Sequence, residues 1–359
     1  MDRLEKYIEC YIPNKACNLR CNYCYAARAA RSSENPARLS RTPEDVKKAF
    51  SIDKLGQCLI NVCADGETLM PPDTLSVVIA LLENGHFVSI VTNGTLYSRF
   101  LEISRFSPAL LERLFIKFSF HYLELKRLNL IDAFFDNIAT VHSAGCSFSV
   151  EITPCDELEP HIDEIKRLCM EKLGALCHVT IARNDDSPNI DVLSTRKFEE
   201  YLKIWSVFQS PLFDFKSKIF YKKRREFCYS GYWSLFINLD SGKAIQCHYG
   251  KKLGNIYDDN PIKLKPVGYA CNSPHCFNGH AYLTLGLIPS LPCPSYAEMR
   301  DRPAQWLSPA VKAFFSQKLA DNNVSHPDEK KSVRKNFFNG KIPLYARKIK
   351  VFIKMAINK

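Results

Sequence analysis

The 359-residue sequence predicts an α/β fold: a partial (β/α)6 barrel, then a small domain of β-hairpin and loops, and helices at the C-terminus. Three observations predict it. Short apolar runs alternate with helix-like segments up to residue 182, which is typical of parallel strands covered by helices. Polar residues and glycines follow several of these runs, at the strand ends where such folds bind ligands. A later, proline-rich region combines a hairpin pattern with cysteines.

The elements of the barrel can be read in order along the chain. Its predicted strands are the apolar runs 7–13, 57–63, 87–92, 114–120, 148–153 and 177–182. The predicted helices are 42–50, 72–82, 124–144, 158–173 and 197–208. Pro43 in a first turn, followed by two acidic residues, favours the start of the first of these helices.

The chain changes character after the sixth strand, which suggests four parts. Residues 216–225 are strongly basic and are interpreted as a connector rather than a helix. The parts are expected to be a barrel, a helical and basic connector, a hairpin-and-loop domain, and C-terminal helices: 1–186, 187–227, 228–300 and 301–359.

Composition excludes several classes of protein. The chain is 46% apolar and 24% charged, which is typical of a globular protein. The charged N-terminus has no apolar stretch of a signal peptide, and no apolar run approaches the ~18 residues of a membrane span. Fifteen cysteines without an export signal favour metal chemistry in a reducing cytoplasm over a disulfide framework.

The net charge of +11 is concentrated in the tail. Residues 330–359 hold ten basic residues and no acidic one, so the first 329 residues carry about +1. Within this tail, 343–357 has the pattern of a basic amphipathic helix. Such a helix indicates peripheral contact with a membrane surface or an acidic partner, or docking onto the protein itself. No recognition fold joins the basic residues, so nucleic acid is not expected as a partner.

Three cysteines after the first strand form the most specific motif. Cys17, Cys21 and Cys24 have the spacing C-x3-C-x2-C. Three thiolates this close can ligate three irons of a [4Fe–4S] cluster and leave the fourth iron open to a small molecule. A zinc knuckle is the alternative, but zinc needs four ligands. Cys10, the other cysteine nearby, falls within a predicted strand.

The run 16–25 resembles the signature of the radical S-adenosylmethionine (SAM) superfamily, including the aromatic Tyr23 before the third cysteine. The resemblance implies that the open iron binds SAM. It also implies that the reduced cluster cleaves SAM to methionine and a 5′-deoxyadenosyl radical, which abstracts hydrogen from a substrate. An electron donor such as flavodoxin or ferredoxin is implied as a partner.

Further motifs resemble the SAM-binding positions of this family. Gly66 and Glu67 resemble the end of its Gly-Gly-Glu turn, although Asp65 replaces the first glycine. That turn is implied to hold the methionine amino group of SAM; a plain turn glycine before a helix is the alternative. Asn93 matches the Thr-Asn-Gly after the third strand, and Ser119 ends the fourth, where a polar contact to SAM is implied.

Two charged residues of the last barrel strands are candidates for contact with SAM or substrate. Glu151 lies within an apolar strand, and an unpaired buried carboxylate is costly, so it is expected to point towards SAM or substrate. The glycine-rich motif of the family is absent from this strand. Arg183 follows the sixth strand and could bind a carboxylate, or lie on the surface.

A second cysteine group lies in the hairpin region. Cys228 and Cys247 flank the predicted strand 234–239, and Cys271 and Cys276 follow, which makes four potential ligands. The arrangement resembles the SPASM/twitch extension of radical SAM enzymes and implies a second, auxiliary [4Fe–4S] cluster. Cys293 could replace one of the last two ligands. A zinc ribbon is the alternative, because four thiolates also suit zinc.

The reaction and the substrate stay open at this stage. Cys63 and Cys155 are predicted near strand ends, where a thiol could return a hydrogen atom to a substrate radical; core packing is the alternative for both. The resemblance implies oxidation, epimerisation or cross-linking of a peptide, a carbohydrate or another small molecule. The alternative function is an iron–sulfur or zinc protein without catalysis, with a structural or electron-transfer role.

Overall fold

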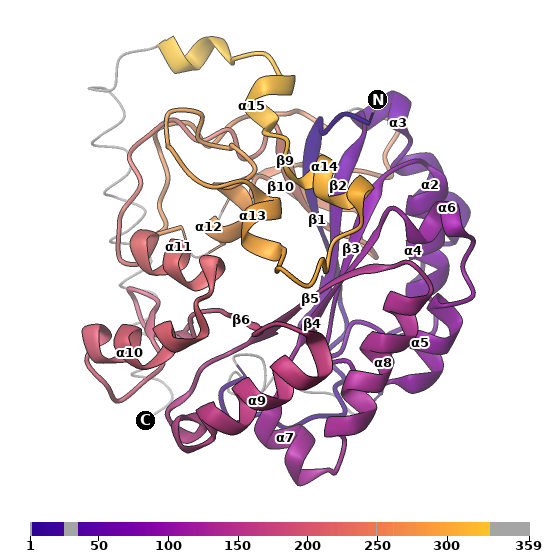
Figure 1. The fold of residues 1–359 in the computed structure, drawn as a ribbon. Coiled ribbons are helices and arrows are strands. Elements are labelled where there is room, and N and C mark those ends of the chain that lie inside the picture. Colours follow the sequence, from indigo (N-terminus) through magenta and orange to yellow (C-terminus); the bar gives the residue numbers. More distant parts are fainter. Residues whose placement is uncertain (1, 25–34, 249, 261, 277, 331–359) are drawn as a thin grey trace.

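The computed structural model of the protein describes residues 2–24, 35–248, 250–260, 262–276 and 278–330. A nine-stranded sheet runs through it in the order β11-β10-β9-β1-β2-β3-β4-β5-β6 (Figure 1). The six strands of the barrel pair in parallel, which confirms the predicted fold class. They are β1 (Lys6–Ile12), β2 (Cys58–Ala64), β3 (Phe87–Thr92), β4 (Leu114–Ser119), β5 (Ser147–Ile152) and β6 (His178–Val179).

Helices cover the barrel strands on one side, and a second group packs on the other (Figure 1). The first group is α2 (Pro43–Ala49), α3 (Ile52–Leu55), α4 (Thr74–Glu83), α5 (Tyr97–Ile103), α6 (Pro108–Leu111), α7 (Tyr122–Arg127), α8 (Ile131–Ser143) and α9 (Ile162–Leu173). The later helices are α10 (Phe198–Trp205), α11 (Pro211–Ile219), α12 (Gly279–Tyr282), α13 (Tyr296–Arg300), α14 (Pro309–Phe315) and α15 (Leu319–Asn322). Among the described residues, no helix is sufficiently long and apolar to cross a bilayer.

Two hydrophobic clusters follow from the alternation of side chains along each strand. Ile116 and Val150 face the first helix group and belong to the larger cluster. Phe115, one residue earlier on β4, belongs to the smaller cluster and meets Phe315 of α14 edge-on at 5.1 Å. The same alternation turns the polar and charged residues within the strands towards the interior of the barrel.

The hairpin region continues the sheet of the barrel. Strand β9 (Ser234–Asn238) pairs in parallel with β1, and β10 (Lys243–Ile245) and β11 (Lys252–Asn255) extend it antiparallel. The predicted hairpin is therefore present, and its strands share one sheet with the barrel because the free edge of β1 accepts β9. A separate ribbon of two short strands, β7 (Arg183–Asn184) and β8 (Asp191–Val192), follows β6.

Three predicted elements differ from the structure. The single helix expected at 124–144 is divided into α7 and α8, because Asn129 adopts a left-handed conformation with φ +55°. The strand expected at 177–182 is only two residues long at the edge of the sheet. The basic segment 216–225 was interpreted as a connector, but its first four residues complete helix α11, where Lys216 is buried. The predicted basic helix 343–357 lies outside the described residues.

Candidate active site

The loop that carries Cys17, Cys21 and Cys24 begins at the carboxyl end of β1 and is bound to the turn after β2. Gly66 and Glu67 donate their backbone N–H groups to the carbonyls of Asn14 and Ala16, each at 2.8 Å. A Cβ at Gly66 would lie 2.1 Å from the Ala16 carbonyl oxygen. Only glycine allows this close approach, so the Asp65-Gly66-Glu67 turn supports the backbone immediately before Cys17.

Glu67 lies at the junction of this turn with β3. Its carboxylate accepts hydrogen bonds from the Thr92 hydroxyl and the Asn93 backbone N–H, both at 2.7 Å, and from the Leu69 N–H at 3.0 Å. The side chain is buried, and burial raises the pKa of the carboxyl although these donors oppose the effect. Its bonds link β2 to the end of β3, so Glu67 orders the strand ends in this structure.

Asn93 extends the link to the cysteine loop. Its side-chain amide donates to Asn18 Oδ1 at 2.8 Å and lies 3.8 Å from Cys17 Sγ. The side-chain oxygen Oδ1 of Asn93 accepts hydrogen bonds from the Thr95 backbone N–H and hydroxyl, and these bonds fix the orientation of the amide. The structure thereby brings the Thr-Asn-Gly turn against the first cysteine.

Tyr23 connects the other end of the cysteine loop to the end of β4 through a hydrogen bond. Its hydroxyl lies 2.7 Å from His121 Nδ1, two residues beyond Ser119. Burial lowers the pKa of His121 to about 4, so its ring is neutral at neutral pH. Tyr23 and Ser119 both line the large cavity described below. The cysteine loop thus lies across the carboxyl ends of β1 to β4.

The three thiols suit a cluster by their chemistry and by their place on one short loop. Burial raises the pKa of Cys17, and burial with the neighbouring Cys24 and Cys17 raises that of Cys21 to about 12. Bound iron would reverse this preference, because metal ligation deprotonates thiols. Within the described part of the chain, no three Cys, His, Asp or Glu side chains converge closely enough to hold a single metal ion. The residues present fit an iron–sulfur cluster as a donor set, with three soft ligands on one short loop.

A cavity of about 750 Å³ opens beside the cysteine loop, inside the barrel. Its walls include Cys63 from β2 and Glu9 from β1, and Cys63 Sγ lies 4.0 Å from a Glu9 carboxylate oxygen. Cys155 does not line this cavity. It borders a smaller hollow of about 320 Å³ together with Asn22 and Tyr23. The structure therefore separates the two thiols that sequence reasoning treated alike.

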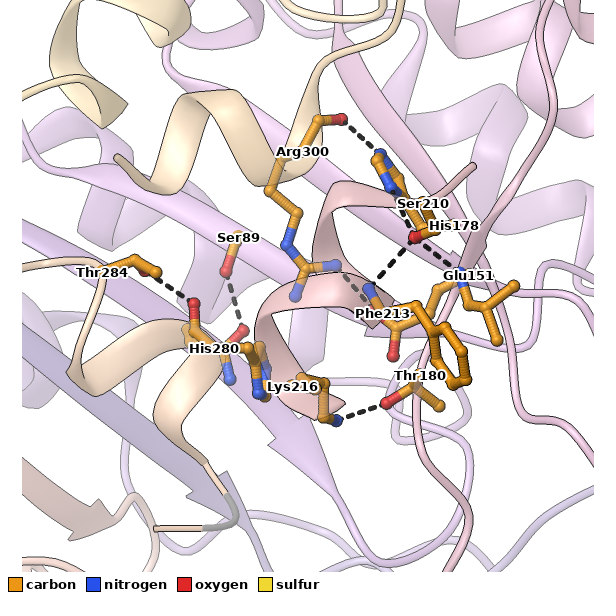
Figure 2. A network of polar contacts seen from close by, with 12 residues as sticks. Ser89, Glu151, His178, Thr180, Ser210, Phe213, Lys216, His280, Thr284 and Arg300 are labelled. Atoms are coloured by element: carbon orange, nitrogen blue, oxygen red, sulfur yellow. Dashed lines mark hydrogen bonds and ion pairs between the residues drawn. The ribbon is translucent and has the colours of Figure 1, made fainter. Parts of the chain in front are cut away.

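Glu151 points into the large cavity and forms an ion pair there. Arg300 Nη1 of α13 lies 2.6 Å from its carboxylate (Figure 2). Burial would raise the pKa of Glu151, but Arg300, Lys216 and Lys117 outweigh it and hold that pKa at about 2. Glu151 is thus a carboxylate with a cation of its own. Sequence reasoning placed it in the interior but did not find Arg300, which lies about 150 residues away in the chain.

Arg183 also lines the cavity, where it forms an ion pair with Asp185 at 2.7 Å. Sequence reasoning missed four further groups of the wall: Glu9, Lys117, Lys216 and His280. Glu9 and Lys117 had a usable signal, because each is a charge within an apolar strand, as Glu151 is. Lys216 and His280 had no such signal in the sequence, because each lies in a segment whose position depends on tertiary contacts.

The thiols of the second cysteine group lie near enough to affect one another's pKa. Burial raises the pKa of Cys228 well above its ordinary value, and Cys271, Cys276 and Cys247 raise it further by their charge. The backbone carbonyls of Cys271 and Ser273 both accept from the Lys223 ammonium, the latter at 2.6 Å. These contacts hold the loop that carries the third ligand candidate.

Cys293 stands apart from this group. Its thiol donates to the Leu283 carbonyl at 2.9 Å, and the charges that act on its pKa after burial are those of Lys318 and Glu298. Cys293 therefore takes no part in the mutual electrostatic effects of Cys228, Cys247, Cys271 and Cys276. His248, next to Cys247, lies 3.1 Å from Glu9, so the group adjoins the large cavity.

Comparisons with known proteins agree with this geometry. The family model described as the Radical SAM superfamily matches residues 11–169. The structure is similar to SuiB of Streptococcus suis bound to S-adenosylmethionine, with TM-score 0.50 and 14% identity over 72% of this chain and 67% of that chain. It is equally similar to SuiB bound to the precursor peptide SuiA, with TM-score 0.50 and 15% identity over 73% and 65% of the two chains.

A third similar structure is native anSMEcpe with bound AdoMet and Cp18Cys peptide, with TM-score 0.49 and 14% identity over 96% of this chain and 99% of that chain. No match was found among curated protein sequences. At 14–15% identity, the two SuiB structures support the fold alone. The family match covers the cysteine loop, the turns after β2 and β3, strands β2 to β5 and the last two residues of β1, so this part of the chain, residues 11–169, is similar to the radical SAM superfamily.

Proposed function

We propose that the protein is an enzyme that cleaves SAM reductively and abstracts a hydrogen atom from a substrate in the large cavity. Cys17, Cys21 and Cys24 would hold three irons of a [4Fe–4S] cluster, and the fourth iron would take SAM. The observation that carries the proposal is the position of the cysteine loop, which lies across the carboxyl ends of β1 to β4 beside a cavity of about 750 Å³.

The residues around the loop have positioning roles in this proposal. When bound, the reduced cluster supplies the electron that divides SAM into methionine and a 5′-deoxyadenosyl radical. Gly66 allows the close backbone approach, Glu67 orders the ends of β2 and β3, and Asn93 and Tyr23 hold the two ends of the loop. Ser119 would contact SAM from the cavity wall. A rigid loop keeps the radical close to the substrate instead of releasing it to solvent.

Cys63 is the candidate group for completing the reaction. Abstraction of a substrate hydrogen atom produces 5′-deoxyadenosine and a substrate radical. If Cys63 then donates a hydrogen atom, the outcome is epimerisation, and the thiyl radical must afterwards be reduced. If the substrate radical instead loses an electron and a proton, the outcome is oxidation. Cys63 lines the cavity and Cys155 does not, so Cys63 is the one of the two that we retain for this role.

In the oxidation route, a second [4Fe–4S] cluster on Cys228, Cys247, Cys271 and Cys276 would accept the electron that the substrate radical loses. Their grouping, and the contact of His248 with Glu9 in the cavity wall, support this assignment. We also retain the division into 1–186, 187–227, 228–300 and 301–359 as functional parts, although β9 joins the third part to the barrel sheet.

Substrate and electron donor complete the proposal. A peptide, a carbohydrate or another small molecule could occupy the cavity, and the similar SuiB structure with a bound precursor peptide supports the first. Flavodoxin or ferredoxin would donate the electron. All fifteen cysteines are free thiols, which supports a reducing compartment such as the cytoplasm.

Anaerobic reconstitution with iron and sulfide tests the proposal. We expect about eight irons per chain, a change in the electron paramagnetic resonance spectrum on addition of SAM, and 5′-deoxyadenosine under strong reduction. Cys21→Ala should abolish the last two. About four irons together with zinc would assign the second group to zinc. If the protein binds iron but shows neither the spectral change nor 5′-deoxyadenosine on addition of SAM, a structural or electron-transfer role is supported instead.

A further inference from the structure

Four basic side chains from separate parts of the chain line the large cavity. Lys117 comes from β4, Arg183 from β7, Lys216 from α11 and Arg300 from α13. Lys117, Lys216 and Arg300 retain only 9%, 6% and 1% of their exposure. Figure 2 shows Lys216 and Arg300 gathered beside Glu151, with His280 of α12 next to Lys216. Burying this many cations in one place is costly unless anions accompany them.

The four carboxylates of the cavity wall already have partners, and the first, Asp65, accepts from the Tyr11 hydroxyl at 3.0 Å. Glu151 pairs with Arg300 at 2.6 Å and Asp185 with Arg183 at 2.7 Å. Glu9 accepts from His248, Asn278 and Tyr282. Lys216 donates to the neutral hydroxyl of Thr180 (Figure 2). In the part of the chain that the structure describes, neither Lys117 nor Lys216 has a carboxylate within ion-pair distance.

The surroundings of Lys216 include the other basic side chains of the wall. Burial, with Arg183, Arg300 and Lys117, lowers the pKa of Lys216 to about 7 against the opposing effect of Glu151. Arg300 Nε and His280 Nδ1 are buried and lack a hydrogen-bond partner among the described residues. An anion between the ammonium groups of Lys117 and Lys216 would give each of them the charged partner that it lacks among the described residues.

We propose that the cavity binds an anionic oxygen group of the substrate, a carboxylate or a phosphate, between Lys117 and Lys216, with Arg300 and His280 beside it. Two ammonium groups from different elements can direct several donors at such a group without demanding one fixed orientation. The identification of the anion as part of the substrate rests on the proposed function. The binding of an anion in the cavity does not depend on that function. SAM carries a carboxylate too, so the test must separate the two.

The test uses the cluster-loaded protein with saturating SAM at pH 6.5, anaerobically, and inorganic phosphate or acetate as the probe. Chloride keeps the ionic strength constant, and the unfolding temperature is recorded as the probe concentration rises. We expect one or both probes to stabilise the wild type beyond chloride. Lys216→Met and Lys117→Met, tested as separate variants, should each raise at least tenfold the probe concentration that gives half of the maximal stabilisation. Lys218→Met, on the exposed side of α11, should respond as the wild type does.

Three results would overturn the inference. The probes could act no better than chloride, or both variants could respond like the wild type. A response that occurs without SAM but disappears with it would assign the lysines to the SAM carboxylate instead. Which probe acts distinguishes a phosphate from a carboxylate site. SAM cleavage is measured separately on the wild type and Lys218→Met, so a failure of the proposed function would be seen apart from the anion response.

Discussion

Replacing Lys216 by Met should stabilise the protein, because a buried ammonium group is removed while its aliphatic packing is kept. The pKa of Lys216 is lowered from its ordinary value of 10.5 to about 7, with burial as the largest cause. At about 1.36 kcal/mol per pKa unit, the difference corresponds to about 5 kcal/mol that disfavours the folded, charged form. Unfolding a chain of 359 residues changes the entropy by roughly 0.75 kcal/mol/K, so the unfolding temperature should rise by about 6 °C.

The gain should depend on pH with a definite sign. Below about pH 7 the ammonium is charged in both the folded and the unfolded states, so the wild type bears the full cost of burying it. Between about pH 7 and 10.5 only the unfolded chain keeps the proton, so the unfolding free energy of the wild type rises with pH. The advantage of Lys216→Met should therefore fall to about 2 °C at pH 9.5.

The assay is thermal unfolding of the cluster-loaded protein without SAM, followed anaerobically by circular dichroism at pH 6 and pH 9.5. Lys218→Met is the matched control, since Lys218 lies two residues away on the exposed side of the same helix. It should change the unfolding temperature little at either pH. Equal temperatures for the wild type and Lys216→Met at pH 6 would refute the reasoning. A gain that does not change with pH would attribute the effect to packing instead of charge.

Three further outcomes are expected. Gly66→Ala should lower SAM cleavage at least tenfold with the circular dichroism spectrum retained, because its Cβ would lie 2.1 Å from the Ala16 carbonyl oxygen; unchanged cleavage would show that the turn does not position the cysteine loop. Cys276→Ser should lower the iron content by about four irons per chain, whereas Cys293→Ser should leave the iron content unchanged. Equal losses of iron in the two variants would contradict the separation of Cys293 from the second cysteine group. Arg300→Met should destabilise the protein by about 2–3 kcal/mol, because it leaves the half-buried Glu151 without its ion-pair partner. Adding Glu151→Gln should recover much of this loss in chemical denaturation. No recovery would mean that Arg300 acts through packing.

Local patterns in the sequence were sufficient for the barrel and its cysteine loop. The strands around Ile90, Ile116 and Val150 are apolar runs bounded by turns, and such runs depend on neighbours only a few residues away. The spacing of Cys17, Cys21 and Cys24 is likewise local, because one short loop supplies all three ligands. Glu151 was placed in the interior for the same reason, as a charge within an apolar strand.

Elements whose boundaries depend on distant contacts were predicted less well. The division between α7 and α8 depends on the left-handed backbone of a single residue, Asn129, which the apolar pattern does not reveal. The basic run after residue 215 suggested a solvated connector, yet α11 buries Lys216 against β6 and α13. Composition alone could not distinguish the two, because the environment of a lysine is decided by what packs on its helix.

The sequence by itself determined the order of parallel strands, the three-cysteine loop and the resemblance of residues 11–169 to the radical SAM superfamily, since each depends on residues close together in the chain. Only the tertiary structure decided that Cys63, but not Cys155, lines the large cavity, and that Cys293 stands apart from the other four thiols. It also decided the charge of the cavity wall. Lys117, Lys216 and Arg300 come from segments up to 183 residues apart, and their mutual repulsion exists only once folding has removed the water between them.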